Sequence, residues 1–157
     1  MKRRYLWPLS ILSLLLPFSL LAQSSISPPL SAIVVTSPFG IREHPLTGMP
    51  SFHAGVDLRA HHSLIYSILP GRIIGCGYQP LLGRFVRIDH GDTQSVYGHL
   101  SAVLVENGSL VEAGSIIGLS GNSGRTTAEH LHFAVFYGRR PVHPLKFLFH
   151  LQAILEK

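Results

Sequence analysis

The sequence predicts an all-β domain, a small antiparallel sheet or sandwich with a substrate groove and a minor C-terminal helix. Its apolar segments are short and rich in β-branched and aromatic residues, and glycine or Asn-Gly turns separate them. No long amphipathic helical pattern occurs before Pro144. Short strands of this kind bury one face by packing as a sheet or a sandwich.

The strands can be placed along the chain from their composition. Within residues 107–124, five glycines alternate with Leu, Ile and Val, which predicts tight strands joined by turns. The tail, residues 144–157, is apolar and poor in charge, and we expect it to form a short closing helix. The clearest strand patterns fall at residues 72–74, 85–89, 95–97 and 132–137.

The N-terminal segment, residues 1–22, is predicted to be a secretory signal. Three basic residues precede an apolar run over residues 5–21, and Ala22 offers a small residue for cleavage. A transmembrane anchor is the competing interpretation, but the run holds two prolines and, at about 17 residues, has only the minimum length for a span. We therefore expect an exported protein of the periplasm, the cell surface or the medium.

One compact domain should follow this segment. Residues 23–33 are rich in Ser and Pro and predict a flexible or extended lead-in, so that the domain proper covers residues 34–157. Three of the 13 Lys and Arg lie in the predicted signal, which leaves ten against eight Asp and Glu; this near balance does not indicate a nucleic-acid partner. The single cysteine, Cys76, cannot form an internal disulfide.

Two clusters offer ligands for a divalent metal. His53 and Asp57 are four residues apart, His130 and His132 flank one leucine, and His99 lies between the two clusters. A catalytic zinc site uses three protein ligands of the His or carboxylate type and leaves a fourth position open for water. Each cluster alone is weak evidence, but together they supply that set and leave histidines to spare.

Geometry constrains both clusters. If residues 53–57 were extended, their ends would lie ~13 Å apart, too far for two ligands of one metal, so the segment must bend, and Gly55 is where it can. A helical H-E-x-x-H site is excluded, because the segment contains Gly55 and lacks the internal Glu. His130 and His132 lie in a β-run, so both imidazoles project from one face of the sheet.

Four motifs, taken in their order along the chain, resemble those of a known protein family. Ser-Pro-Phe-Gly-Ile-Arg at residues 37–42, His-x-Gly-x-Asp at 53–57, Tyr-Gly-His-Leu at 97–100 and Gly-Asn-Ser-Gly-Arg leading into His-Leu-His-Phe at 121–133 resemble the ordered signature of the lysostaphin/LytM-type zinc endopeptidases of peptidoglycan. The similarity runs from about residue 35 to residue 148. It implies that residues 34–157 form a zinc peptidase catalytic domain.

The resemblance also implies roles for five side chains. His53, Asp57 and His132 would hold Zn²⁺, and His99 and His130 would be the catalytic histidines. Zinc in such a site lowers the pKa of its water toward ~7. The two catalytic histidines would deprotonate or orient that water, stabilise the oxyanion and protonate the leaving amine. Which of the two does which stays open.

The chain departs from the family pattern at two positions. Ala134 stands where a Glu often follows the second cluster, which we expect to matter little because that Glu is not a usual ligand. His44 stands where some members carry a Tyr that is thought to steady the transition state. Two interpretations of His44 remain: it takes over that role, since imidazole can donate as phenol does, or it is a plain loop histidine. The remaining histidines are expected at the surface or in structural roles, namely His61, His62, His90, His143 and His150.

The function implied by the resemblance is hydrolysis of peptide cross-links or stem peptides of peptidoglycan. The substrate would lie extended in a groove walled by loops 36–52 and 121–129. The alternative is a catalytically silent protein that binds wall peptides and activates another hydrolase; its hallmark would be a lost ligand, and every expected residue is present. A structural or metal-storage protein would not need His99 and His130 as well. We expect a monomer, with targeting from the groove or from a protein activator or targeting partner.

Overall fold

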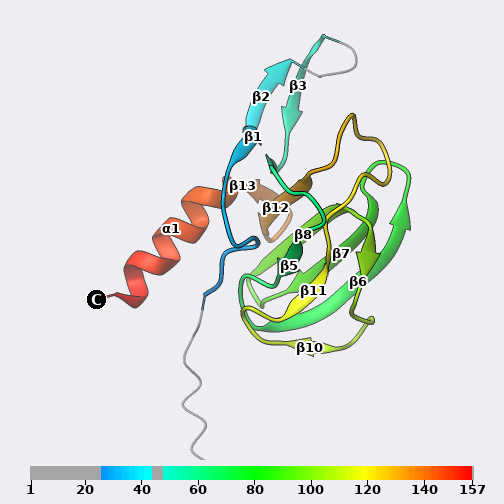
Figure 1. Ribbon diagram of the computed structural model, residues 1–157. Coiled ribbons are helices and arrows are strands. Elements are labelled where there is room, and N and C mark those ends of the chain that lie inside the picture. Colours follow the sequence, from blue (N-terminus) through cyan, green and yellow to red (C-terminus); the bar gives the residue numbers. More distant parts are fainter. Residues whose placement is uncertain (1–25, 44–47, 157) are drawn as a thin grey trace, which may run out of the picture.

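The computed structural model describes residues 26–43 and 48–156 (Figure 1). Within these ranges the chain forms strands that are mostly short and one helix near the C-terminal end. The elements are β1 (Val35–Ser37), β2 (Gly40–Glu43), β3 (Pro50–His53), β4 (Val56–Leu58), β5 (Leu64–Tyr66), β6 (Gly71–Gln79), β7 (Gly83–Asp89), β8 (Thr93–Leu100), β9 (Ala102–Val103), β10 (Leu110–Val111), β11 (Ile116–Leu119), β12 (Leu131–Tyr137), β13 (Arg140–Val142) and α1 (Pro144–Leu155).

The main sheet has the strand order β1-β4-β12-β8-β7-β6-β10, and β13 extends it by pairing with β12. A second sheet has the order β5-β11-β9, and β2 and β3 form a separate hairpin that projects beyond both sheets (Figure 1). All of these strand pairs are antiparallel. The predicted all-β architecture with a minor C-terminal helix is confirmed.

The core lies on one face of the central strands β12 and β8. Tyr97 and Phe133 are paired across these strands and are fully buried, with ring centroids 5.4 Å apart. Ile65 of β5 and Ile117 of β11 belong to the same buried cluster, so the smaller sheet covers this face. The tyrosine hydroxyl is not left unpaired, because it accepts a hydrogen bond from the backbone N–H of Ile68 at 3.1 Å. The opposite face of the same strands is therefore free to carry polar side chains.

The described part of the predicted lead-in, residues 26–33, is irregular but anchored. Leu30 is buried in the core, and the backbone N–H of Ser27 donates to the carbonyl of Ile68 at 3.0 Å. The backbone N–H of Tyr66 donates in turn to the carbonyl of Pro29. Ser and Pro explain the lack of regular structure, whereas the single leucine fixes the segment to the domain. The predicted signal, residues 1–22, lies outside the described residues.

Helix α1 begins at Pro144, which suits the first turn because a proline there forgoes no intrahelical hydrogen bond. Leu145 and Leu148 pack against the core, while Phe149 is exposed. In the described part of the chain, no helix is both long and apolar enough to cross a bilayer.

Candidate active site

Three side chains of the metal-ligand type converge at one end of the main sheet. The Nδ1 atom of His132 lies 2.9 Å from Oδ1 of Asp57 and 3.1 Å from Nε2 of His53. The same Nε2 atom of His53 lies 3.2 Å from Oδ1 of Asp57. His53, Asp57 and His132 are the three residues that the resemblance assigned to zinc, and the structure brings them together.

Strand pairing explains how residues far apart in sequence meet here. Asp57 of β4 stands directly opposite His132 of β12, and cross-strand neighbours project from the same face. The chain bends at residues 54–55, between β3 and β4, and so brings His53 back toward Asp57. Gly55 is needed for space: a Cβ there would lie 2.8 Å from Cε1 of His132 and 2.6 Å from the carbonyl oxygen of Phe133. The predicted bend is present.

The hydrogen bonds of the site present lone pairs to a cation. The Nδ1–H group of His53 donates to the carbonyl of Pro38 at 2.9 Å, and Nε2 of the same ring lies 3.2 Å from Oδ1 of Asp57, where a cation could replace the proton between them. Burial opposes ionisation of Asp57, but its contacts with His130, His132 and His53 outweigh burial and hold the pKa of its carboxyl far below the usual range. One carboxylate and two imidazoles about 3 Å apart fit the ligand set of a zinc ion with an open fourth position.

His99 reaches this face through a β-bulge at the end of β8. Between the pairs Val86↔Tyr97 and Arg84↔Leu100, strand β8 contains one residue more than β7. Regular alternation would turn His99 away from the face that carries His132, whose partner on β8 is Gly98. Instead His99 adopts a left-handed backbone with φ 61°, which is uncommon for a residue other than glycine and costs about 1–2 kcal/mol. Its ring centroid lies 6.0 Å from that of His132.

The ring of His99 is fixed in one tautomer. Its Nδ1–H group donates to the carbonyl of Ser123 at 2.8 Å, so Nε2 is the free ring nitrogen. Burial lowers the pKa of His99 to about 4, although the Ser123 carbonyl opposes the shift. The side chain is therefore neutral near pH 7 and can accept a proton at Nε2.

His130 stands beside His99, with ring centroids 4.7 Å apart. Its Nδ1–H group donates to the carbonyl of Ala128 at 2.8 Å, and its Nε2 atom lies 3.5 Å from Oδ1 of Asp57. Burial disfavours the charged ring, but Asp57 and the Ala128 carbonyl outweigh burial and raise the pKa of His130 above its usual value. His130 and His132 thus face the same side of the sheet, as the β-pattern predicted.

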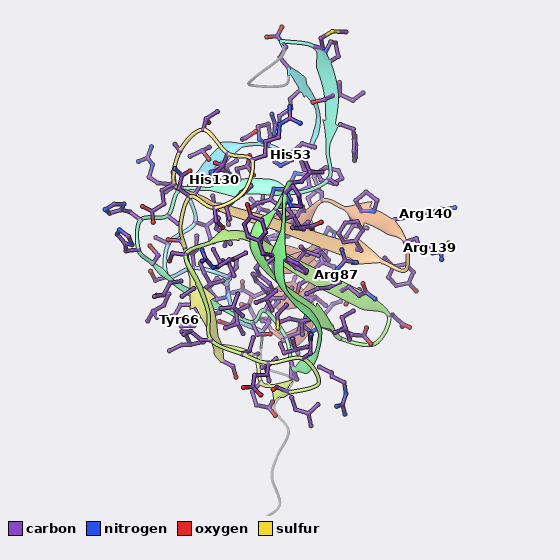
Figure 2. All side chains as sticks on the ribbon, turned by 90° about the vertical axis from the view of Figure 1, so that its right-hand side faces the viewer. His53, Tyr66, Arg87, His130, Arg139 and Arg140 are labelled. Carbon is purple, nitrogen blue, oxygen red and sulfur yellow. The ribbon has the colours of Figure 1, made fainter. Side chains whose placement is uncertain are left out.

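All five side chains line one cavity of about 220 Å³. Figure 2 shows two of them, His53 and His130, at the same end of the sheets. The predicted walls are present in part, since Arg42 comes from the β2–β3 hairpin and Arg125 from the loop before His130. Leu81 and Leu82, in the β6–β7 turn, form a wall that the sequence did not indicate.

Arg42 is the residue of the site whose role the sequence left unassigned. Its Nη2 atom lies 3.7 Å from Oδ2 of Asp57, whereas the three histidines lie at the other carboxylate oxygen, Oδ1. The sequence feature that could have pointed to Arg42 as a site residue is its position as the last residue of the Ser-Pro-Phe-Gly-Ile-Arg motif. The remaining site prediction, His44 as transition-state support, lies outside the described residues.

An antiparallel β domain with a His-Asp-His ligand set and two further histidines in one cavity defines the class of metal-dependent hydrolases. Comparison with known proteins specifies the family. The model of peptidase family M23 matches residues 51–144, and the chain belongs to this family. This agrees with the lysostaphin-type resemblance of the sequence motifs.

Curated relatives carry the names of cell-wall enzymes. The chain is 38% identical over 107 residues to the peptidoglycan DD-endopeptidase ShyA of Vibrio cholerae. The aligned region is 67% of this chain and 25% of ShyA. It is 34% identical over 119 residues to the DD-carboxypeptidase/endopeptidase Mpg of Neisseria meningitidis, covering 74% of this chain and 27% of that protein. The chain therefore spans about a quarter of the length of these relatives.

Solved structures show the same fold. A zinc-containing peptidase from Vibrio cholerae aligns with a TM-score of 0.67 at 37% identity, over 71% of this chain and 35% of the other. The catalytic domain of lysostaphin from Staphylococcus simulans aligns with a TM-score of 0.67 at 30% identity, over 74% of this chain and 92% of that domain. The chain thus corresponds closely in extent to a lysostaphin catalytic domain.

Proposed function

We propose that this protein is a zinc-dependent endopeptidase that hydrolyses peptide cross-links or stem peptides of bacterial peptidoglycan. The observation that carries the proposal is the convergence of five side chains on one cavity, with His53, Asp57 and His132 arranged as metal ligands and His99 and His130 beside them. Family membership and similarity to the DD-endopeptidase ShyA and the DD-carboxypeptidase/endopeptidase Mpg support the reaction and the substrate class.

The ligand set fits Zn²⁺, which when bound in such a site supplies a water of lowered pKa and polarises the carbonyl of the peptide bond to be cut. Around it the chain's own residues handle protons. Neutral His99 accepts a proton at Nε2, because its Nδ1 is already committed to the Ser123 carbonyl. His130, whose Nδ1–H group is committed to the Ala128 carbonyl and whose Nε2 atom lies 3.5 Å from Oδ1 of Asp57, would stabilise the developing oxyanion and pass a proton to the leaving amine.

Two arginines suit a peptide substrate in the groove. Arg42 fixes one oxygen of Asp57 and leaves the other for the histidines. Arg125 is exposed in the loop before His130, where it can bind a carboxylate of a peptide stem. The protein would act outside the cytoplasm, as a monomer, with a protein activator or targeting partner where wall binding by the groove is not sufficient.

The test pairs zinc content with product analysis on one preparation of purified protein. Incubation with purified peptidoglycan is expected to release new amino groups, and mass spectra of the digest should show cleaved peptides with intact glycan chains. An Asp57→Ala protein is the matched control, and it should release none. New reducing sugar ends without new amines would overturn the proposal. Peptide binding with no cleavage by a zinc-loaded protein would instead favour a silent activator.

A further inference from the structure

A second group of metal-ligand side chains lies outside the candidate active site. His61, His62 and Glu129 each offer one ligand atom, and these atoms all lie within 4.8 Å of one another. None of the three lines the cavity that contains His53 and His132. His61 and Glu129 are 68 residues apart in sequence, so no sequence pattern links them, and the two histidines were expected at the surface or in structural roles.

The backbone places the two histidines side by side. Consecutive residues of an extended chain project to opposite sides, but His62 adopts a left-handed conformation with φ 44°. The ring centroids of His61 and His62 consequently lie only 4.7 Å apart. A left-handed conformation is strained for a residue with a Cβ, so the surrounding contacts must maintain it.

Glu129 supplies those contacts and is itself held in place. Its Oε1 atom accepts hydrogen bonds from the backbone N–H of His62 at 2.6 Å and from the hydroxyl of Ser120 at 3.2 Å. Ser120 is fully buried, and its hydroxyl also accepts from the backbone N–H of Ser63. The second carboxylate oxygen, Oε2, remains for side-chain partners, and Nδ1 of His61 lies 2.6 Å from it.

We propose that His61, His62 and Glu129 form a second binding site, for a divalent transition-metal ion such as Zn²⁺, separate from the candidate catalytic centre. Imidazole and carboxylate ligands together suit Zn²⁺, Cu²⁺ and Ni²⁺ rather than Mg²⁺ or Ca²⁺, which prefer oxygen ligands. A cation here replaces the proton between Nδ1 of His61 and Oε2 of Glu129. Because His61 and His62 are exposed, the ion keeps water ligands and is held less tightly than one at His53, Asp57 and His132.

The position of Glu129 gives this site a consequence for the groove. Glu129 directly precedes His130, and the segment that ends there carries Arg125 and Thr126 of the cavity wall. A metal bound to His61 and Glu129 ties the loop after β4 to this wall. Occupancy of the second site should therefore restrict the motion of the wall without adding a ligand to the catalytic centre.

The test is zinc binding to the untagged, zinc-loaded protein at pH 7.5, by competition with a chromophoric zinc chelator. Wild-type protein is expected to bind a second, weaker equivalent. His61→Ala, Glu129→Gln and His62→Asn should each weaken that equivalent by at least tenfold, since even partners that only orient a ligand contribute 10–100-fold to metal affinity. Asparagine is chosen at position 62 because it tolerates the left-handed backbone.

His150→Ala is the matched control, because His150 is an exposed histidine on α1 that belongs to neither site. It should retain both equivalents, and all four variants should keep the tightly bound first equivalent and the wild-type melting curve. A wild-type protein that binds only one equivalent overturns the proposal. So does a second equivalent that His61→Ala, His62→Asn and Glu129→Gln leave unchanged, because the ion would then bind elsewhere.

Discussion

Half-buried His90 and buried His99 make the same hydrogen bond through Nδ1 and differ in the partner of Nε2. His90, in the turn between β7 and β8, donates from Nδ1 to the carbonyl of Pro70 at 2.8 Å, and His99 donates from Nδ1 to the carbonyl of Ser123 at 2.8 Å. Burial lowers the pKa of both rings. The Nε2 atom of His90 accepts from the Ser95 hydroxyl at 2.7 Å, whereas Nε2 of His99 has no protein partner in the described part of the chain.

The comparison teaches where to look for chemistry in a histidine-rich protein. A ring with both nitrogens paired inside the fold is a cross-link between segments, and its removal affects stability. A ring with one nitrogen fixed and the other facing a cavity is held for reaction with something else. The direction of the pKa shift is the same for His90 and His99, so it does not separate the two kinds of histidine, but the partner of the second ring nitrogen does.

The largest difference between the candidate active site and the region around His90 should be in zinc content. His132→Ala is expected to lose zinc and to reduce peptidoglycan hydrolysis to the level of a blank. A catalytic zinc site uses three protein ligands, and the two that remain would not hold the ion tightly. His90→Ala should keep its zinc. Atomic emission after dialysis measures both. Near-stoichiometric zinc in the His132→Ala protein would contradict the ligand assignment, particularly if His130→Ala were the variant that lost it.

The next largest effect is on turnover with metal retained. His99→Ala should keep zinc and the fold yet lose about 10²-fold or more in kcat, the usual scale for a general acid or base or an oxyanion donor. His90→Ala, corrected for the folded fraction, should turn over at the wild-type rate. Equal losses of kcat in His99→Ala and His90→Ala would show that the partner of Nε2 does not distinguish a catalytic histidine from a structural one.

A double variant tests whether His99 and His130 act as one unit. Each single alanine variant should retain zinc, and the double variant should lose less activity than the product of the two single losses, because residues that act together are non-additive. The measurement is kcat on the same peptidoglycan preparation for the four proteins. Strictly multiplicative losses would show that the two rings act independently.

For the free energy of unfolding, the region around His90 should matter more than the candidate active site. His90→Ala leaves the buried Ser95 hydroxyl and the Pro70 carbonyl without their partner, and should lower the free energy of unfolding by about 1–3 kcal/mol. Urea denaturation with an unchanged slope is the measurement. His150→Ala, at the surface of α1, serves as the control and should change stability by no more than about 0.5 kcal/mol.

The smallest effect is the pH dependence of that stability. Burial lowers the pKa of His90 below its ordinary value of 6.5, so the unfolded chain binds this proton more readily than the folded one. The contribution of neutral His90 is complete above about pH 6.5 and is lost as the pH falls from there toward the lower folded-state pKa. The stability difference between wild type and His90→Gln should therefore shrink from pH 7.5 to pH 5.5. A stability difference between wild type and His90→Gln that grows on acidification would show that the folded-state pKa of His90 is raised and not lowered.

Local patterns in the sequence predicted the architecture and one bend of the chain. Strand composition and turn glycines were sufficient for an antiparallel β domain, and the spacing of His53 and Asp57 required the bend that the chain makes at residues 54–55. These features are encoded by residues close together in the chain, so they can be read without the fold. Which histidines meet Asp57 came only from the resemblance of the ordered motifs to a known family, because Asp57 and His132 are 75 positions apart.

Features that depend on strand register could not be predicted in this way. Period-two alternation places His99 on the wrong face, and only the extra residue in β8 corrects it. Leu30 was hidden in a Ser- and Pro-rich segment whose composition indicated flexibility. The grouping of His61 with Glu129 arises from two loops that meet only in the folded domain.

The pairing of Asp57 with His132 also has a consequence for folding. These two residues are 75 positions apart, so their contact closes a long loop, and a metal held by both acts as a removable cross-link in a chain whose lone cysteine forms no internal disulfide. The unfolded chain keeps only the local His53 and Asp57 pair, so an ion binds the folded state preferentially and stabilises it by mass action, about 2.7 kcal/mol at a free concentration of 100 times Kd. Chelation would then lower the stability of the folded state, and the supply of metal would set the lifetime of the protein as well as its activity.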